Sequence, residues 1–293
     1  MDIQLDNVSF VYHPRTPFEQ KVLDHISLEI NTGEWLAIIG HTGSGKSTLV
    51  QHLNGLLTPT EGTVHVGDTD IESHISTDTS ELYQDVGMVF QYPEHQLFGE
   101  TVAEDIAFGL KNLGWKEDMI PSRIEETLQV LGMPTTLLDR SPFELSGGQK
   151  RRVALAGVIA MDPDVLILDE PTAGLDPVSK RQLMLWFQEW QKAHNKTIIT
   201  ITHDMQEVAD YANTVAVMED GKCRLKTDPQ DLFTAHHTDL ERMSLQLPRS
   251  YRFVQQLQER MDIDIHSVKK EALYQAIVHA VKREKREKGG GQG

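Results

Sequence analysis

Cysteine and long apolar runs are what this 293-residue sequence has least of. The single cysteine, Cys223, excludes a disulfide framework and a metal site built from several thiolates. No apolar run approaches the roughly 18 residues that a membrane-spanning helix needs, and no signal peptide is recognisable at the N-terminus. We therefore expect a cytoplasmic protein that works in a reducing compartment and does not itself cross a membrane.

Basic charge is also scarce, since 28 Lys and Arg face 44 Asp and Glu and give a formal net charge of −16. A protein that coats nucleic acid or an anionic lipid surface needs basic patches, so we expect no nucleic acid among the partners. The run 282–288, KREKREK, is locally basic. We interpret it as a solvated helix end, followed by a disordered tail.

Short apolar runs alternate with segments of helical periodicity, which is typical of an α/β fold with a mostly parallel sheet. The runs 35–39, 165–168 and 197–202 are predicted to be strands buried on both faces. The segments 3–12 and 26–30 are predicted strands of an antiparallel β subdomain. Helices are predicted at about 46–57, 102–131, 146–161, 181–194 and 205–212.

Two parts of the chain depart from this alternation. The stretch at about 91–160 contains no predicted strand and is interpreted as a helical subdomain. After about residue 232 the pattern changes to two amphipathic helices, at 251–261 and 267–285. We predict one domain over 1–235 and a small α-rich C-terminal extension over 236–293, and we expect the extension to add dimer contacts.

The first motif that carries chemistry is GHTGSGKS at 40–47, which fits the phosphate-binding pattern G-x-x-x-x-G-K-[ST]. It follows a predicted strand and opens a predicted helix, so its backbone N–H groups and the helix N-terminus can face an anion. We expect Lys46 to reach the β- and γ-phosphates and the Ser47 hydroxyl to bind Mg²⁺. The predicted nucleotide-binding residues here are Gly40, His41, Thr42, Gly43, Ser44, Gly45, Lys46, Ser47 and Thr48.

Two carboxylates, Asp169 and Glu170, follow the apolar run 165–168. A buried strand delivers such residues to the sheet edge where ligands bind in open α/β folds. We expect Asp169 to hold Mg²⁺ and Glu170 to take a proton from an attacking water.

A second candidate anion receptor is formed by Ser146, Gly147, Gly148 and Gln149, at the start of a predicted helix. Ser146 also suits a helix N-cap, and both interpretations can hold together. One nucleotide needs only one phosphate cradle. We therefore expect this element to serve a different copy of the site.

These motifs, in this order, resemble the nucleotide-binding subunit of ABC transporters over about residues 2–235. The resemblance implies a P-loop NTPase core, the cofactors ATP and Mg²⁺, and ATP hydrolysis by two subunits that dimerise head to tail. It also implies that Gln91 senses Mg²⁺ and the attacking water, that His203 contacts the γ-phosphate, and that Asp176 belongs to the D-loop. Tyr12 resembles the aromatic residue that stacks on adenine, although strand alternation also explains it.

The stretches 12–18, 90–98 and 141–146 narrow the resemblance to the ATPases of energy-coupling factor transporters, and the first and third are most like the second paralogue, A-prime. This implies uptake of a vitamin or a transition-metal ion, at the cytoplasmic face of the cell membrane. The implied partners are a paralogous ATPase subunit or a second copy, a membrane T subunit in the groove after Gln91, and a substrate-binding S subunit.

Three alternatives remain. An importer ATPase for amino acids, metals or sugars shares the motifs, but the sugar type usually has a longer C-terminal domain. A soluble DNA-repair ATPase would separate its two halves by hundreds of coiled-coil residues, whereas Gln91 and Ser146 are about 55 residues apart. A catalytically silent scaffold is disfavoured because Lys46, Glu170 and His203 are intact.

Overall fold

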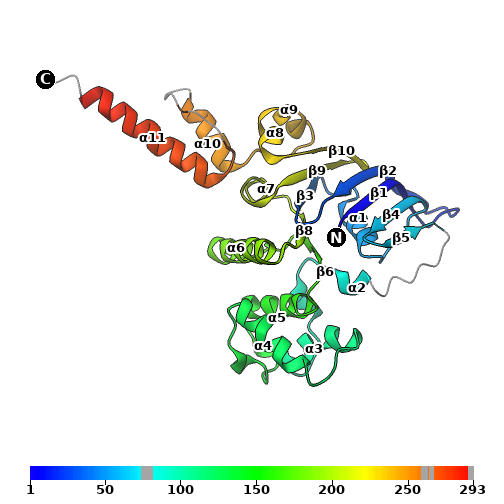
Figure 1. The fold of residues 1–293 in the computed structure, drawn as a ribbon. Coiled ribbons are helices and arrows are strands. Elements are labelled where there is room, and N and C mark those ends of the chain that lie inside the picture. The colour runs from blue at the N-terminus through cyan, green and yellow to red at the C-terminus, as the bar shows by residue number, and fades with distance from the viewer. Residues whose placement is uncertain (74–81, 259–262, 264–266, 290–293) are drawn as a thin grey trace.

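The computed structural model describes residues 1–73, 82–258, 263 and 267–289. Two β-sheets, flanking helices and a separate helical lobe make up the body of the molecule, and a pair of helices extends from it at the C-terminal end (Figure 1). The arrangement is α/β with a mostly parallel sheet, which confirms the predicted fold class.

The smaller sheet is antiparallel and has the strand order β2-β1-β4-β5. Its strands are β1 (Ile3–Tyr12), β2 (Gln20–Ile30), β4 (Glu61–Val66) and β5 (Thr69–Glu72). β2 begins six residues before the predicted start at 26. Irregular pairing with β1 explains the difference: Asn7 and His25 adopt positive φ, and the register shifts between Leu5 and Val8. Such bulges interrupt the side-chain alternation by which a strand is recognised.

The larger sheet has the order β10-β9-β3-β8-β7-β6, and every pairing is parallel except that of β9 with β10. Its strands are β3 (Trp35–Gly40), β6 (Val86–Val89), β7 (Val165–Asp169), β8 (Thr197–Ile201), β9 (Thr214–Glu219) and β10 (Lys222–Thr227). Trp35 and Ile39 pack with the helical part of the core, whereas Leu36 and Ile38 pack with the antiparallel sheet. The parallel strands are therefore covered on both faces, as their apolar runs predicted.

Three helices border the site. They are α1 (Lys46–Leu53), α6 (Pro177–His194) and α7 (Met205–Tyr211). α1 is shorter than the predicted 46–57 because the chain leaves the helix at Asn54 and Gly55, which has φ +73°. α6 begins earlier than the predicted 181, since Asp176 caps it and Pro177 occupies its first turn.

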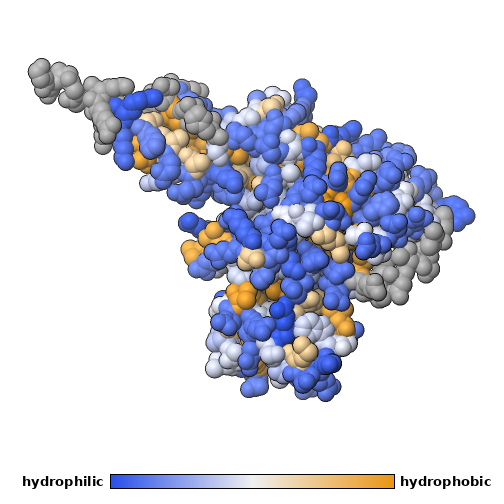
Figure 2. Space-filling view, in the orientation of Figure 1, coloured by the Kyte–Doolittle hydropathy of each residue, from blue (hydrophilic) through white to orange (hydrophobic). Residues whose placement is uncertain are grey.

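The helical lobe is inserted between β6 and β7, and α2 (Leu82–Asp85) precedes β6. The lobe contains η1 (Pro93–Gln96), α3 (Val102–Asn112), α4 (Ile120–Val130), η2 (Thr135–Leu137), η3 (Pro142–Glu144) and α5 (Gly147–Ile159). The segment predicted to be helical over 102–131 is divided into two helices: α3 stops before Gly114, which has φ +73°, and α4 starts at Ile120, with Pro121 in its first turn. Figure 2 shows apolar patches on this lobe among mostly hydrophilic residues.

After β10 the chain forms α8 (Pro229–Thr234), α9 (His237–Arg242), α10 (Arg249–Gln258) and α11 (Lys270–Gly289). Both long helices are anchored to α7, because Ser250 Oγ donates to Gln206 Oε1 at 2.7 Å and Lys270 N donates to Asp210 Oδ1 at 2.7 Å. The predicted helix end at 261 and the predicted tail after 289 fall outside the described residues. The second helix, predicted to start at 267, starts at Lys270. No helix in the described part of the chain is both long and apolar enough to span a bilayer.

Candidate nucleotide-binding and hydrolysis site

The phosphate-binding loop begins where β3 ends. All six residues of β3 are buried, so the strand fixes Gly40 at the sheet edge. Gly40 has φ +152°, and a Cβ atom there would lie 2.2 Å from the carbonyl oxygen of Met218. Gly43 and Gly45 also have positive φ, at +83° and +99°. The loop therefore depends on glycine for both its conformation and its close approach to β9.

Lys46 lies inside the curve of this loop. Its Nζ donates to the carbonyl oxygens of Gly40 at 2.9 Å and His41 at 2.8 Å. Burial lowers the pKa of Lys46, and the charges of Asp169 and Glu170 oppose that shift. A phosphate in the loop would give this half-buried ammonium a charged partner in place of neutral carbonyls, so the residues present fit the nucleotide.

Ser47 and Asp169 form the candidate Mg²⁺ site. Ser47 Oγ donates to Asp169 Oδ2 at 3.3 Å, which joins the start of α1 to the end of β7. Burial raises the pKa of Asp169, the neighbouring Glu170 adds to the rise, and the hydrogen bond from Ser47 opposes it. A hydroxyl beside a carboxylate suits a hard cation with oxygen ligands, as Mg²⁺ is.

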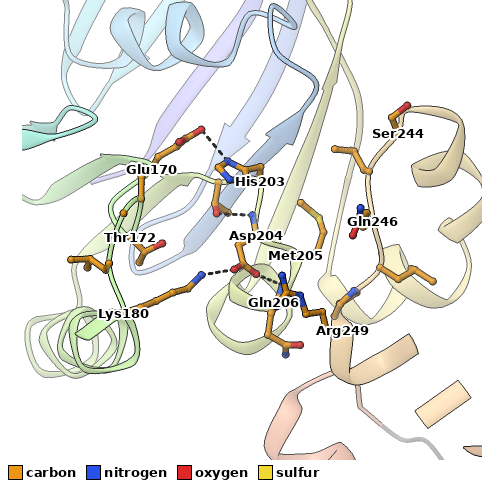
Figure 3. Close-up of a pocket in the computed structure, with 17 residues that line it drawn as sticks. Glu170, Thr172, Lys180, His203, Asp204, Met205, Gln206, Ser244, Gln246 and Arg249 are labelled. Carbon is orange, nitrogen blue, oxygen red and sulfur yellow. Dashed lines mark hydrogen bonds and ion pairs between the residues drawn. The ribbon is translucent and has the colours of Figure 1, made fainter. Parts of the chain in front are cut away.

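Glu170 is contacted by both of the other predicted catalytic residues. Gln91 Nε2 donates to Glu170 Oε2 at 2.8 Å, and His203 Nδ1 lies 3.1 Å from Glu170 Oε1. These residues follow β6, β7 and β8, which are adjacent in the sheet. Figure 3 shows Glu170 and His203 facing each other across the ends of two of these strands. Glu170 adopts φ +49°, a conformation that costs a non-glycine residue free energy.

Tyr12 ends β1, half-buried, with its ring edge-on to Phe10 at a centroid distance of 4.8 Å. Phe10 in turn meets the ring of the buried His52 at 4.8 Å. His52 Nδ1 contacts the carbonyl oxygen of Thr48 at 2.7 Å. The predicted adenine platform therefore rests on a row of rings that reaches the first helix after the phosphate loop.

The second anion receptor opens α5 with a capping box. Ser146 N donates to Gln149 Oε1 at 3.0 Å, and Gln149 N donates to Ser146 Oγ at 3.4 Å. A Cβ on Gly147 or Gly148 would meet nothing within 4 Å. The motif thus caps its helix and still leaves an open face. α5 lies in the helical lobe, apart from α1 (Figure 1).

Asp176 is the N-cap residue of α6. It accepts hydrogen bonds from Val178 N at 2.9 Å and Ser179 N at 3.1 Å, and also from the Ser179 hydroxyl. The Ser179 hydroxyl and backbone hydrogen bonds lower the pKa of Asp176. The role of its carboxylate in this structure is therefore to shape the loop that precedes α6.

Sequence reasoning missed Arg151, two residues after the second receptor. Its side chain is 5% exposed, Nη1 donates to Ala173 O at 2.7 Å, and Nε lies 3.8 Å from Glu94 Oε2. Arg151 thereby joins α5 to the segment after Gln91 and to the loop before Asp176. Its signal was weak, because an arginine in an amphipathic helix is usually solvent-exposed.

A cavity of about 510 Å³ adjoins the site (Figure 3). Glu170 and residues 172–175 and 202–206 form one side of it, and residues 244–249 of the C-terminal extension form the other. Lys180 borders the cavity and forms ion pairs with Asp204 and with Glu207, whose Oε1 lies 2.9 Å from Lys180 Nζ. Burial alone would lower the pKa of Lys180, but these two carboxylates raise it.

A family model and individual relatives of known name both place the chain in the same family. The family model "ABC transporter" matches residues 23–173. The energy-coupling factor transporter ATP-binding protein EcfA2 of Clostridium tetani is 49% identical over 261 residues, which cover 89% of this chain and 90% of that protein. The protein of the same name from Clostridium acetobutylicum is 44% identical over 97% of this chain and its own whole length.

Solved structures agree with these relatives. CbiO1 from Clostridium perfringens, described as part of the ABC transporter complex cbiONQ, superposes with a TM-score of 0.71 at 36% identity, over 86% of this chain and 98% of its own. A dimeric ATP-binding cassette, MJ0796, bound to ADP and Pi in a post-hydrolysis state, superposes with a TM-score of 0.69 at 26% identity, over 78% of this chain and 99% of its own.

Proposed function

Because the chain belongs to the ABC transporter family and, within it, to the energy-coupling factor transporter ATP-binding proteins, we propose that it drives uptake of a vitamin or a transition-metal ion. The chain is an ATPase, and its cofactors are ATP and Mg²⁺. The observation that carries the proposed chemistry is the contact of Glu170 with both Gln91 and His203, at the end of the sheet that also holds the phosphate loop.

Glu170 is the proposed general base. Gln91 donates to one of its carboxylate oxygens and His203 contacts the other, so the carboxylate is held on two sides before water arrives. Lys46 and the loop amides would bind the phosphates, and Ser47 and Asp169 would hold the metal ion. Mg²⁺ held there would neutralise charge on the phosphate oxygens. Glu170 then takes the proton from the water that attacks the γ-phosphate.

A second nucleotide-binding subunit completes the site. Subunits of this family pair with another ATPase subunit and with membrane components. The open face of Gly147 and Gly148 supports the proposal that 146–149 contacts the nucleotide held by the partner. We propose a paralogous subunit, or a second copy of this chain, in that position.

The proposed docking surface for the membrane T subunit follows Gln91. Tyr92, Phe98 and Phe108 are exposed large aromatic residues, and the rings of Phe98 and Phe108 meet edge-on at 4.8 Å. Exposed aromatic residues of this kind are enriched at protein–protein interfaces. An S subunit then binds the cargo, and the chain works as a peripheral subunit on the cytoplasmic face of the cell membrane.

Purification of the tagged chain from membranes solubilised in detergent tests this assignment. We expect a T subunit, an S subunit and a second ATPase subunit to co-purify. Phe98→Asp should lose the membrane proteins, whereas Phe253→Asp, a matched change at an exposed residue of α10, should retain them. A pair of permeases with a soluble binding protein in place of these partners would overturn the assignment in favour of another importer class.

A further inference from the structure

Glu207 is a buried carboxylate that none of the chemistry above uses. It lies on α7, four residues after His203, and is 4% exposed. A carboxylate is costly to bury unless it is paired and hydrogen-bonded. The partners that Glu207 has here are therefore informative about what it does.

Three donors from three segments converge on Glu207. Thr172 Oγ1 donates to Oε1 at 2.5 Å, and Thr202 Oγ1 donates to Oε2 at 2.7 Å. Lys180 Nζ also lies 2.9 Å from Oε1. Because the two threonines bind different oxygens, the carboxylate bridges the segments that contain them.

Each threonine is close in sequence to a proposed catalytic residue. Thr172 comes two residues after Glu170, and Thr202 comes directly before His203. On the histidine side, Asp204 N donates to Thr202 Oγ1 at 3.0 Å, so the residues on both sides of His203 are tied together. Figure 3 shows Thr172, Lys180 and Asp204 below the contact between Glu170 and His203.

A further pair of contacts transmits this restraint to the backbone of Glu170. Ala173 N donates to Glu170 O at 3.1 Å, and Glu170 N donates to Ile201 O at 2.9 Å. The strained backbone of Glu170 is therefore held by hydrogen bonds on both sides. Restraints of this kind are what keep a residue in an unfavourable conformation.

We infer that Glu207 is a positioning residue that fixes the separation of Glu170 and His203 through Thr172 and Thr202. This inference rests on the proposed roles of Glu170 and His203. Glu207 contacts no residue of the phosphate loop among its described partners, so its loss should impair the chemical step and spare nucleotide binding.

The test is Glu207→Gln in the full-length chain, purified with its partner ATPase and membrane subunits. The amide keeps the size of the side chain and one accepting oxygen. The other oxygen is replaced by an NH₂ group, which is a donor and faces a threonine hydroxyl. We expect kcat to fall about 10- to 100-fold, the loss that a misplacement near 1 Å produces, with KM for ATP within about 2-fold. Glu189→Gln, an exposed change on α6, is the matched control and should leave both constants unchanged.

A double-mutant cycle separates positioning from general loss of structure. Thr172→Val removes one hydroxyl, keeps the shape of the side chain and leaves the Lys180–Glu207 ion pair intact, so it tests the inference even if Glu207→Gln does not fold. We expect Thr172→Val to lower kcat and to add no further loss when combined with Glu207→Gln. Wild-type kcat in Thr172→Val, or independent losses in the double variant, overturns the inference.

Glu170→Gln is measured in the same assay. If Glu170→Gln is inactive while Glu207→Gln and Thr172→Val turn over normally, the inference about Glu207 fails and the proposed function stands. If Glu170→Gln turns over normally, the proposed role of Glu170 fails first.

Discussion

Gln91 Nε2 donates a hydrogen bond to Glu170 Oε2 over 2.8 Å, although 79 residues separate the two along the chain. The whole helical lobe is inserted between them, because Gln91 follows β6 and Glu170 follows β7, its parallel neighbour. A partner that moves the segment after Gln91 would therefore also move Gln91, which donates a hydrogen bond to the proposed base. This contact is the most direct physical link between the proposed docking surface and the chemistry.

Asp169→Asn tests how much the charged carboxylate of the candidate metal site destabilises the fold when no metal is bound. Burial, together with Glu170, raises the pKa of Asp169 above its ordinary value of 3.8. A carboxyl whose pKa is higher in the folded state stabilises the fold below the unfolded pKa and loses that contribution as pH rises through the folded pKa. Ionised Asp169 is therefore unfavourable at neutral pH when no metal is bound.

We expect Asp169→Asn to raise the melting temperature of the nucleotide-free protein at pH 7 and to abolish Mg²⁺-dependent ATP turnover. Thermal unfolding without nucleotide measures the first effect, and an ATPase assay with MgATP measures the second. A lower melting temperature for the variant at pH 7 would show that the charge of Asp169 stabilises the fold.

His52 predicts a dependence of stability on pH. Burial lowers its pKa from 6.5 to about 4. The unfolded chain therefore binds more protons between these values, and the stabilisation present above pH 6.5 is lost as pH falls toward 4. From pH 7 to pH 5 we expect the free energy of unfolding to drop by about 2 kcal/mol on account of this residue, given about 1.4 kcal/mol for each unit of pKa shift.

Urea unfolding of His52→Leu and of His194→Gln, an exposed control, checks this expectation. The drop between pH 7 and pH 5 should shrink in His52→Leu and persist in the control. The same pH dependence in wild type and His52→Leu would assign the effect to other groups.

Gly148→Asp tests whether the open face of α5 meets a phosphate of another subunit. The position has room for a side chain, and an acidic residue suits the first turn of a helix, so the variant should fold. A carboxylate facing a phosphate costs several kcal/mol, so ATP turnover in the assembled complex should fall by about 10-fold or more. ATP binding to the isolated chain should not change.

Gly148→Ala is the control that adds a methyl group without charge, and it should lose much less turnover. Equal losses in the two variants would show that steric contact, and not charge, dominates this face. Normal turnover in Gly148→Asp would exclude a phosphate there.

The proximity of the candidate catalytic residues was predictable, because they stand at the ends of neighbouring strands. Asp169 ends an apolar strand, Glu170 directly follows it, and His203 comes two residues after another strand. Parallel neighbours end at one edge, so their proximity follows from the alternation of strands and helices. The sequence could not give the Gln91–Glu170 contact itself, which depends on how the helical lobe folds back between them.

The misses have local physical causes. The early start of β2 was hidden by the irregular pairing near His25, and α8 was overlooked although Asp228 and Pro229 are a recognisable helix start. The buried partners of Glu207 could not be predicted from the sequence, for a different reason. Thr172, Thr202 and Lys180 belong to three segments, and only the tertiary fold brings them to one carboxylate.

The central claim is that Glu170 is the base for ATP hydrolysis, and Glu170→Gln tests it most directly. ATP turnover and equilibrium binding of MgATP are measured on the wild-type and variant complexes side by side. We expect the variant to bind ATP as the wild type does and to lose its turnover, because an amide oxygen of the same size does not accept the proton of the attacking water. Undiminished turnover with normal binding would contradict the assignment of Glu170 as the base.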